Sequence, residues 1–117
     1  MLKKSIVLGL AVLAAGCGGW QSYPLPVSAG EAHHTFAPLA ACASQQGFKF
    51  VTFPDAVNVR YDGSTWVQFM VQAGAYNMVI IVGTDVPEPE RPARLGAAKA
   101  KGDELFACAM RTPRPPR

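Results

Sequence analysis

Two adjacent histidines near a glutamate are the first residues whose types suggest chemistry. Imidazole and carboxylate groups are common ligands of zinc, and Glu31 lies close to His33 and His34. Adjacent histidines point in different directions on a helix, and positions 37 and 38, where a second histidine ligand would follow, hold Ala and Pro. Because Glu31 and His34 alone are too few for a specific site, we expect no metal and no cofactor. A weak response to pH is the alternative role for Glu31 and His34.

A hydrolytic site would have to be assembled from Ser44, Asp55, Asp62 and Asp103. None of them lies in a G-x-S-x-G motif, and the chain has no phosphate-binding glycine pattern. Asp55 and Asp62 are typical turn residues. We therefore predict that the protein is not an enzyme. A hydrolase with an unrecognised site is the alternative, which substitution of His34 and Asp62 would test.

The N-terminal residues are typical of an export signal. Lys3 and Lys4 precede an uncharged apolar run over 5–15, which leads to Cys17, the layout of a secretory signal peptide. At about 1.5 Å per residue, a helix of this length is shorter than the roughly 30 Å hydrocarbon core of a bilayer. We predict that residues 1–16 are a removable signal rather than a permanent membrane helix.

The junction Leu13-Ala14-Ala15-Gly16-Cys17 resembles the lipobox of bacterial lipoproteins, although Ala14 stands where Leu is most common. The resemblance is confined to the N-terminal signal region. It implies cleavage after Gly16, diacylglyceryl transfer to the Cys17 sulfur and acylation of the new amine, as with palmitate. Two or three acyl chains hold a domain on a membrane far better than one. Gly18, in place of Asp, implies the outer membrane, with the domain facing the periplasm. An ordinary signal with an incidental cysteine is the alternative.

Three cysteines are an odd number for an exported protein. If Cys17 carries lipid, Cys42 and Cys108 remain as a pair in an oxidising compartment, where a structural disulfide is expected. On the chain-entropy model this disulfide would stabilise the fold by roughly 4 kcal/mol. A redox or metal pair is the alternative, but neither cysteine lies in a C-x-x-C motif. We predict a Cys42–Cys108 disulfide.

Composition indicates one small, weakly charged domain. The chain has 117 residues, 50% of them apolar, with 11 Lys+Arg against 8 Asp+Glu. Loss of Lys3 and Lys4 with the signal lowers the formal net charge from +3 to +1. This balance lacks the basic excess of a nucleic-acid-binding protein, so we expect no nucleic-acid partner.

Turn residues divide the middle of the chain into short strands. Aromatic, β-branched and alternating residues predict strands at 48–53, 57–61, 66–72 and 76–82. The short turns at 62–64 and 73–75 imply antiparallel pairing. The last strand is the most apolar and is expected at the centre of the sheet.

Helices are expected on both sides of these strands. Ser28 and Glu31 have capping-box spacing, so a helix begins there or, because Pro38 disfavours an uninterrupted helix, near Thr35, and it ends at Gly47. A proline-rich crossover leads to a second helix that contains Cys108.

We therefore predict an α+β fold in α-β-β-β-α order. It has a small antiparallel sheet of three to four strands flanked by two disulfide-linked helices, the second of which can break near Gly102. Glycines and prolines after Cys17 indicate a linker. The predicted division is a signal peptide 1–16, a lipid-anchored linker 17–27, a single domain 28–110 and a basic Pro/Arg tail 111–117.

The sheet face opposite the helices is the candidate binding surface. It would present Arg60, Trp66, Gln68, Met70 and Gln72, and Trp, Met and Arg are enriched at interface cores. A second small hydrophobic layer under the linker or the crossover is the alternative.

The tail residues Arg111, Arg114 and Arg117 are candidates to contact anionic lipid, at about 1 kcal/mol per charge near a membrane surface. A solvated end without a role is the alternative. Together these features predict a non-enzymatic, membrane-anchored, periplasm-facing lipoprotein that binds an envelope protein or a cell-wall component as an adaptor. A small-ligand-binding or enzyme-inhibitor module is the alternative function.

Overall fold

Alternating apolar and polar residues over 57–72 and a mostly apolar run over 76–82 form the meander that the sequence predicts. In the computed structural model, which describes residues 19–111, strands β3 (Ala56–Asp62), β4 (Thr65–Gln72) and β5 (Ala75–Val82) pair antiparallel in sequence order. Ala73 and Gly74, between β4 and β5, both have positive φ, as a two-residue hairpin turn that matches the strand twist requires. The predicted antiparallel meander is confirmed.

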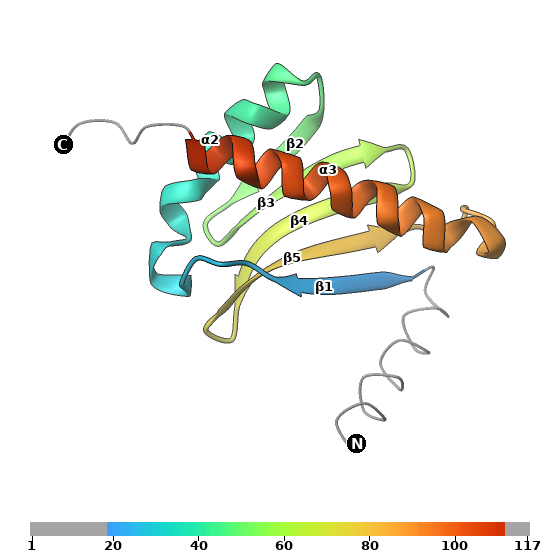
Figure 1. Cartoon of the computed structure of the whole chain (residues 1–117), viewed down its shortest axis with the longest axis horizontal. Helices are drawn as coiled ribbons and strands as arrows, with labels where there is room; N and C mark the ends of the chain where they lie inside the picture. The colour runs from blue at the N-terminus through green and yellow to red at the C-terminus, as the bar shows by residue number, and fades with distance from the viewer. Residues whose placement is uncertain (1–18, 112–117) are drawn as a thin grey trace, which may run out of the picture.

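Two further strands extend the sheet, so that the order across it is β1-β5-β4-β3-β2 (Figure 1). β2 (Lys49–Phe53) pairs with β3 as predicted, and β1 (Trp20–Pro24) pairs with β5. The sheet therefore has five strands instead of three to four, and residues 20–24 belong to it and not to a free linker. Because β1 covers the outer side of β5, the central strand is β4, and the predicted central place of β5 is wrong.

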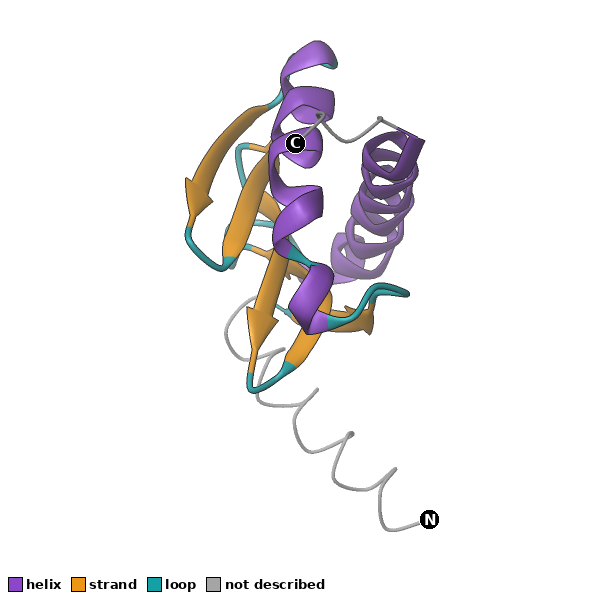
Figure 2. Ribbon diagram, turned by 90° about the vertical axis from the view of Figure 1, so that its left-hand side faces the viewer, coloured by secondary structure: helices purple, strands orange, loops and turns teal. Residues whose placement is uncertain are grey.

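Both helices pack on one face of the sheet (Figure 2). Helix α2 (His33–Gln45) contacts β2 and β3, and helix α3 (Arg91–Arg111) contacts β4 and β5. The α+β class is confirmed, with β1 added in front of the predicted order.

Helix α2 begins differently from the prediction. The 3-10 turn η1 (Ala29–Glu31) precedes it, and the Ser28 side chain makes no capping hydrogen bond, so the predicted capping box is wrong. Pro38 lies inside the continuous helix, where it removes one backbone hydrogen bond. The helix ends before Gly47, whose φ of 81° is typical of a helix C-terminus.

Helix α3 follows the 3-10 turn η2 (Glu88–Glu90) and runs without a break through Gly102. Gly102 is buried against the sheet, where an added Cβ would overlap Met78 Sδ and lie 3.0 Å from Val67 Cγ1. The predicted break is therefore wrong, and the glycine instead allows α3 to approach β4 and β5 closely.

Substitution Gly102→Ala is expected to lower the free energy of unfolding by about 1 kcal/mol, because the overlap with Met78 outweighs the better helix propensity of Ala. Urea denaturation measures this difference. The matched control is Gly96→Ala on the same helix, where nothing lies within 4 Å of the added Cβ and a gain of up to about 1 kcal/mol is expected. Equal gains for both variants would contradict the close packing of α3.

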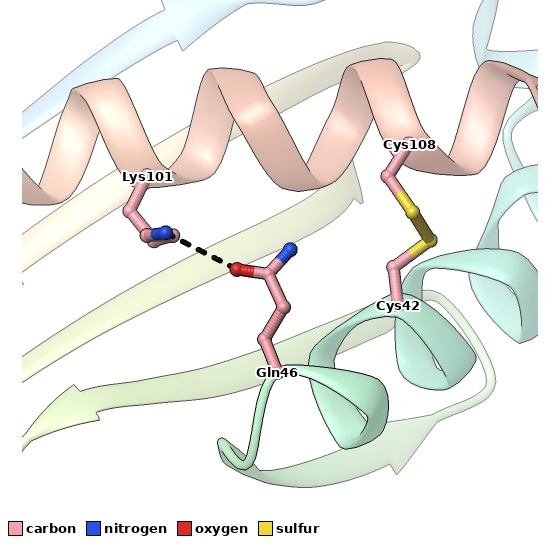
Figure 3. The surroundings of a disulfide bond; sticks show 4 residues. All are labelled: Cys42, Gln46, Lys101 and Cys108. Atoms are coloured by element: carbon pink, nitrogen blue, oxygen red, sulfur yellow. Dashed lines mark hydrogen bonds between the residues drawn. A yellow bond between two sulfur atoms is a disulfide. The ribbon is translucent and has the colours of Figure 1, made fainter.

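The Cys42–Cys108 disulfide joins α2 to α3 (Figure 3), with the two Cα atoms 6.3 Å apart. This prediction is confirmed. Nearby, Lys101 Nζ donates to Gln46 Oε1 over 3.1 Å. The two helices are therefore linked to each other as well as to the sheet.

The core lies between the helices and the sheet. Its largest fully buried side chains include Phe69, Leu39, Met78, Ile80 and Leu105. Phe106 stacks on Phe69 with ring centroids 6.3 Å apart and meets the Tyr76 ring edge-on. Phe69, on the central strand, therefore packs the sheet against α3.

A polar pair lies within this core. The Thr35 hydroxyl donates to the Ala32 carbonyl at 2.7 Å, so in its 2.5 Å contact with Tyr76 it accepts the phenol hydrogen. Burial raises the pKa of Tyr76 from 10.0 to about 12, because a buried phenolate is poorly solvated.

The free energy of unfolding is expected to fall as the pH rises from about 10 to about 12. The unfolded chain loses the Tyr76 proton near pH 10, while the native chain keeps it to about 12, so unfolding releases a proton in this window and the loss reaches about 2 kcal/mol at its upper end. Denaturation at several pH values measures this slope. Tyr76→Phe should lack this part of the slope, and identical slopes in both proteins would contradict the assignment.

Candidate binding surface

The sheet face that neither helix covers is called the open face. The buried residues of β3, β4 and β5 point toward the helices, and the period of two places their neighbours on the other face. By register, these neighbours form three rows across the strands. The first row is Trp20, Ile81, Trp66, Arg60 and Lys49; the second is Ser22, Val79, Gln68, Asn58 and Val51; the third is Pro24, Asn77, Met70, Ala56 and Phe53.

The first row combines two indoles with two cations. The Arg60 guanidinium carbon lies 5.7 Å from the centroid of the Trp66 ring. Arg60 also donates from Nε to the Asp62 carbonyl at 3.3 Å and from Nη2 to the Gly63 carbonyl at 3.2 Å. These bonds hold the guanidinium beside the indole, so the two groups are ordered before any partner arrives, which lowers the entropic cost of binding.

The strand positions of the open face carry Lys49 and Arg60 but no Asp or Glu. Acidic side chains lie instead on helices, in turns and at the end of β3, and several have basic partners. Asp62 pairs with Arg94 at 2.7 Å, and a hydrogen bond from Lys101 lowers the pKa of Glu104. The open face is therefore uncharged over β1, β5 and β4, and it carries its two cations on β3 and β2, beside the apolar Val51 and Phe53. This distribution suits an apolar partner surface with negative charge at one side.

A shallow hollow of about 510 Å³ lies on the open face over β1, β5 and β4. Trp20, Met70, Val79 and Ile81 provide its apolar lining, with side-chain amides such as that of Gln68 between them. Trp20 is 38% exposed, and at the other end of the face Val51 and Phe53 are 47% and 50% exposed. These exposed side chains lie on the two opposite edge strands, with the half-buried Met70, Val79 and Ile81 between them. An apolar surface of this kind is a candidate interaction surface.

The structure brings the predicted surface residues together. Gln68 and Met70 belong to the second and third rows, Trp66 and Arg60 are neighbours in the first, and Gln72 lies opposite Ala75 at the end of β4. The sequence interpretation missed Trp20, Ile81, Val51 and Phe53. Ile81, Val51 and Phe53 lie in strands that the sequence predicts, whereas Trp20 lies in the predicted linker, so its contribution depends on the pairing of β1 with β5.

No protein-family model, curated protein or solved structure matches this chain. None of the helices within residues 19–111 is both long and apolar enough to cross a membrane.

The glutamate and the two histidines that were considered as metal ligands lie on the helical side of the molecule. His34 Nε2 is 3.6 Å from Glu31 Oε2, and the His33 and His34 rings are in contact. Across the described range 19–111, no three His, Cys, Asp or Glu side chains gather into a potential metal site. A hollow of about 340 Å³ borders Glu31 and His34.

The residues considered for a hydrolytic site lie on separate elements. Ser44 is exposed on α2, and Asp55 is in the turn between β2 and β3. Asp62 accepts the Ser64 N–H at 2.8 Å in the next turn, as predicted for a turn residue, and Asp103 pairs with Lys99 on α3. Within the described residues, the structure does not assemble them into one site.

The remaining predicted positions are at the two ends. Arg111 is the exposed last residue of α3. Cys17, Arg114 and Arg117 lie outside the described residues.

Proposed function

We propose that this protein is a lipid-anchored lipoprotein of the bacterial cell envelope whose open face binds another envelope protein, as a non-enzymatic adaptor or accessory subunit. The observation that carries the proposal is the first row, where Trp20, Ile81, Trp66 and Arg60 lie side by side on a face that neither helix covers. Trp and Arg are among the residues that most often dominate binding energy at protein interfaces.

The anchor part of the proposal is supported by the lipobox resemblance at Cys17. The disulfide agrees with it, because structural disulfides persist in oxidising compartments such as the periplasm. Substitution Cys17→Ser should release the chain from the outer-membrane fraction, and the mass of the mature N-terminus should show the acyl chains. Retention of the Cys17→Ser chain in the outer-membrane fraction would overturn the anchor.

The binding part is tested by placing a photoreactive residue at position 68, next to Trp66 on the open face, in the native host and identifying what is captured. One envelope protein is expected. The control places the same residue at position 100, which is exposed on α3, and should not capture that protein. Trp66→Ala should abolish complex formation and leave the melting temperature near that of the parent. Equal capture from both positions would overturn the open face as the binding surface.

A small-ligand function is the second candidate, and the 510 Å³ hollow favours it. It predicts that a small molecule, or a fragment of the cell wall, stays bound to the open face through purification and is lost in Met70→Asp. Mass spectrometry of the native protein distinguishes this outcome from a protein partner.

A further inference from the structure

Strand β2 is an exposed edge of the sheet. All five of its residues are exposed, and three of them, Phe50, Val51 and Phe53, are large and apolar. An apolar edge strand without proline is a template for pairing with another strand. The opposite edge, β1, ends in Pro24, which has no N–H to donate.

The backbone groups that β2 directs outward follow from the hydrogen bonds of the sheet. The Val71 N–H bonds to the Asp55 carbonyl at 2.9 Å, so odd-numbered residues of β3 bond toward β4 and even-numbered ones toward β2. Lys49, Val51 and Phe53 are paired with even-numbered residues of β3. Their N–H and C=O groups therefore point toward β3. Phe50 and Thr52 are left to direct theirs outward, where no other strand of residues 19–111 lies.

We propose that β2 pairs antiparallel with β2 of a second copy of this chain, with Val51 opposite Val51. In this register Phe50 of each copy faces Thr52 of the other, and all outward N–H and C=O groups of these two residues form hydrogen bonds. The neighbouring registers are poorer. One sets Phe50 opposite Pro54, which has no N–H, and the other sets Thr52 opposite Phe48, whose N–H already bonds to the Ala43 carbonyl at 2.9 Å.

The side chains of this register are also complementary. Lys49, the one charged residue of β2, faces Phe53 of the other copy, so that no like charges oppose each other and each ammonium can lie against a ring. The two-fold axis at Val51 is perpendicular to the sheet, so the open faces of both copies point the same way. Val51 and Phe53 then join the two open faces into one continuous surface.

The contact is small, because one five-residue strand buries less than the roughly 800 Å² per partner of a standard interface. Confinement to a membrane raises the effective concentration of the copies, so the membrane-bound full chain is the appropriate test material. In this respect the inference rests on the proposed anchor. Fractionation of Cys17→Ser tests that anchor separately.

The test is disulfide crosslinking of Val51→Cys in membranes of the native host under mild oxidation. Opposed residues of a non-hydrogen-bonded antiparallel pair have Cα atoms about 4.5 Å apart, within the range of a disulfide. A reducible homodimer is expected for Val51→Cys but not for Phe53→Cys alone. Coexpressed Lys49→Cys and Phe53→Cys chains should crosslink to each other, which verifies the register.

The additional substitution Thr52→Pro removes one outward N–H and leaves the bonds between β2 and β3 intact. It should abolish the Val51→Cys homodimer while the melting temperature stays near that of Val51→Cys alone. The inference is overturned if Phe53→Cys alone dimerises as well as Val51→Cys, if the dimer survives Thr52→Pro, or if Val51→Cys crosslinks to a different protein or to nothing.

Discussion

Replacement of both Cys42 and Cys108 by Ala is expected to lower the free energy of unfolding by about 4 kcal/mol. The disulfide closes a loop of 66 residues, and in the chain-entropy model its main effect is to restrict the unfolded chain. A single domain of this size has a total stability of roughly 5–15 kcal/mol, so the loss takes a large share of it. Urea denaturation of the oxidised parent and the double variant measures the difference.

A second link between the same helices provides the control. Gln46 accepts a hydrogen bond from Lys101 at the exposed end of α2, and Gln46→Ala should cost less than about 0.5 kcal/mol because exposed polar pairs contribute little. A loss below about 1 kcal/mol for the double cysteine variant would mean that the loop-entropy argument does not apply to this fold. Single cysteine variants are less suitable, since each leaves a reactive thiol.

Phe69→Ala is expected to destabilise the protein by about 4 kcal/mol, whereas Met70→Ala should cost less than about 1 kcal/mol. The two residues are adjacent on β4 but point to opposite faces. Phe69 is fully buried and stacks on Phe106, so its removal leaves a cavity between sheet and helices. Met70 lies half-buried on the open face. Urea denaturation of the two variants gives both values.

Substitutions of Phe69 and Met70 also distinguish an effect on folding from an effect on binding. Phe69→Leu should recover most of the stability without changing the open face. Met70→Asp should remain folded, by circular dichroism and melting temperature, and lose the partner that is captured from position 68. If Met70→Ala were as destabilising as Phe69→Ala, the open face would be a second core and not a binding surface.

Local patterns predicted the middle of this fold well. Strands β3 and β4 alternate apolar and polar residues, β2 is rich in aromatic and β-branched residues, and β5 is a mostly apolar run. Turn signals such as Asp62-Gly63-Ser64 separate them, so both their existence and their pairing follow from short-range chemistry. The disulfide was predictable because it depends on cysteine count and compartment. Gly102 was misjudged because helix propensity alone counts a glycine as a break, while packing against Met78 favours it.

Long-range pairing was not readable from the sequence. Residues 20–24 carry few strand signals and are flanked by Gly and Pro, so their place beside β5 depends on an edge that exists only after the meander has formed. The candidate site shows the same limit. Alternation placed Trp66 and Met70 on one face, but the contribution of Trp20 and the cross-strand rows required the sheet order.

The position of β1 limits the distance between the membrane and the domain of the proposed lipoprotein. Cys17 precedes Trp20 by three residues, a chain length of at most about 10 Å, and Trp20 already belongs to the sheet. A lipid on Cys17 would therefore hold the domain at the level of the headgroups, without the reach to explore the width of the periplasm. Its partner would have to come to the membrane surface, which favours the periplasmic rim of an integral membrane protein over a structure in the distant cell wall.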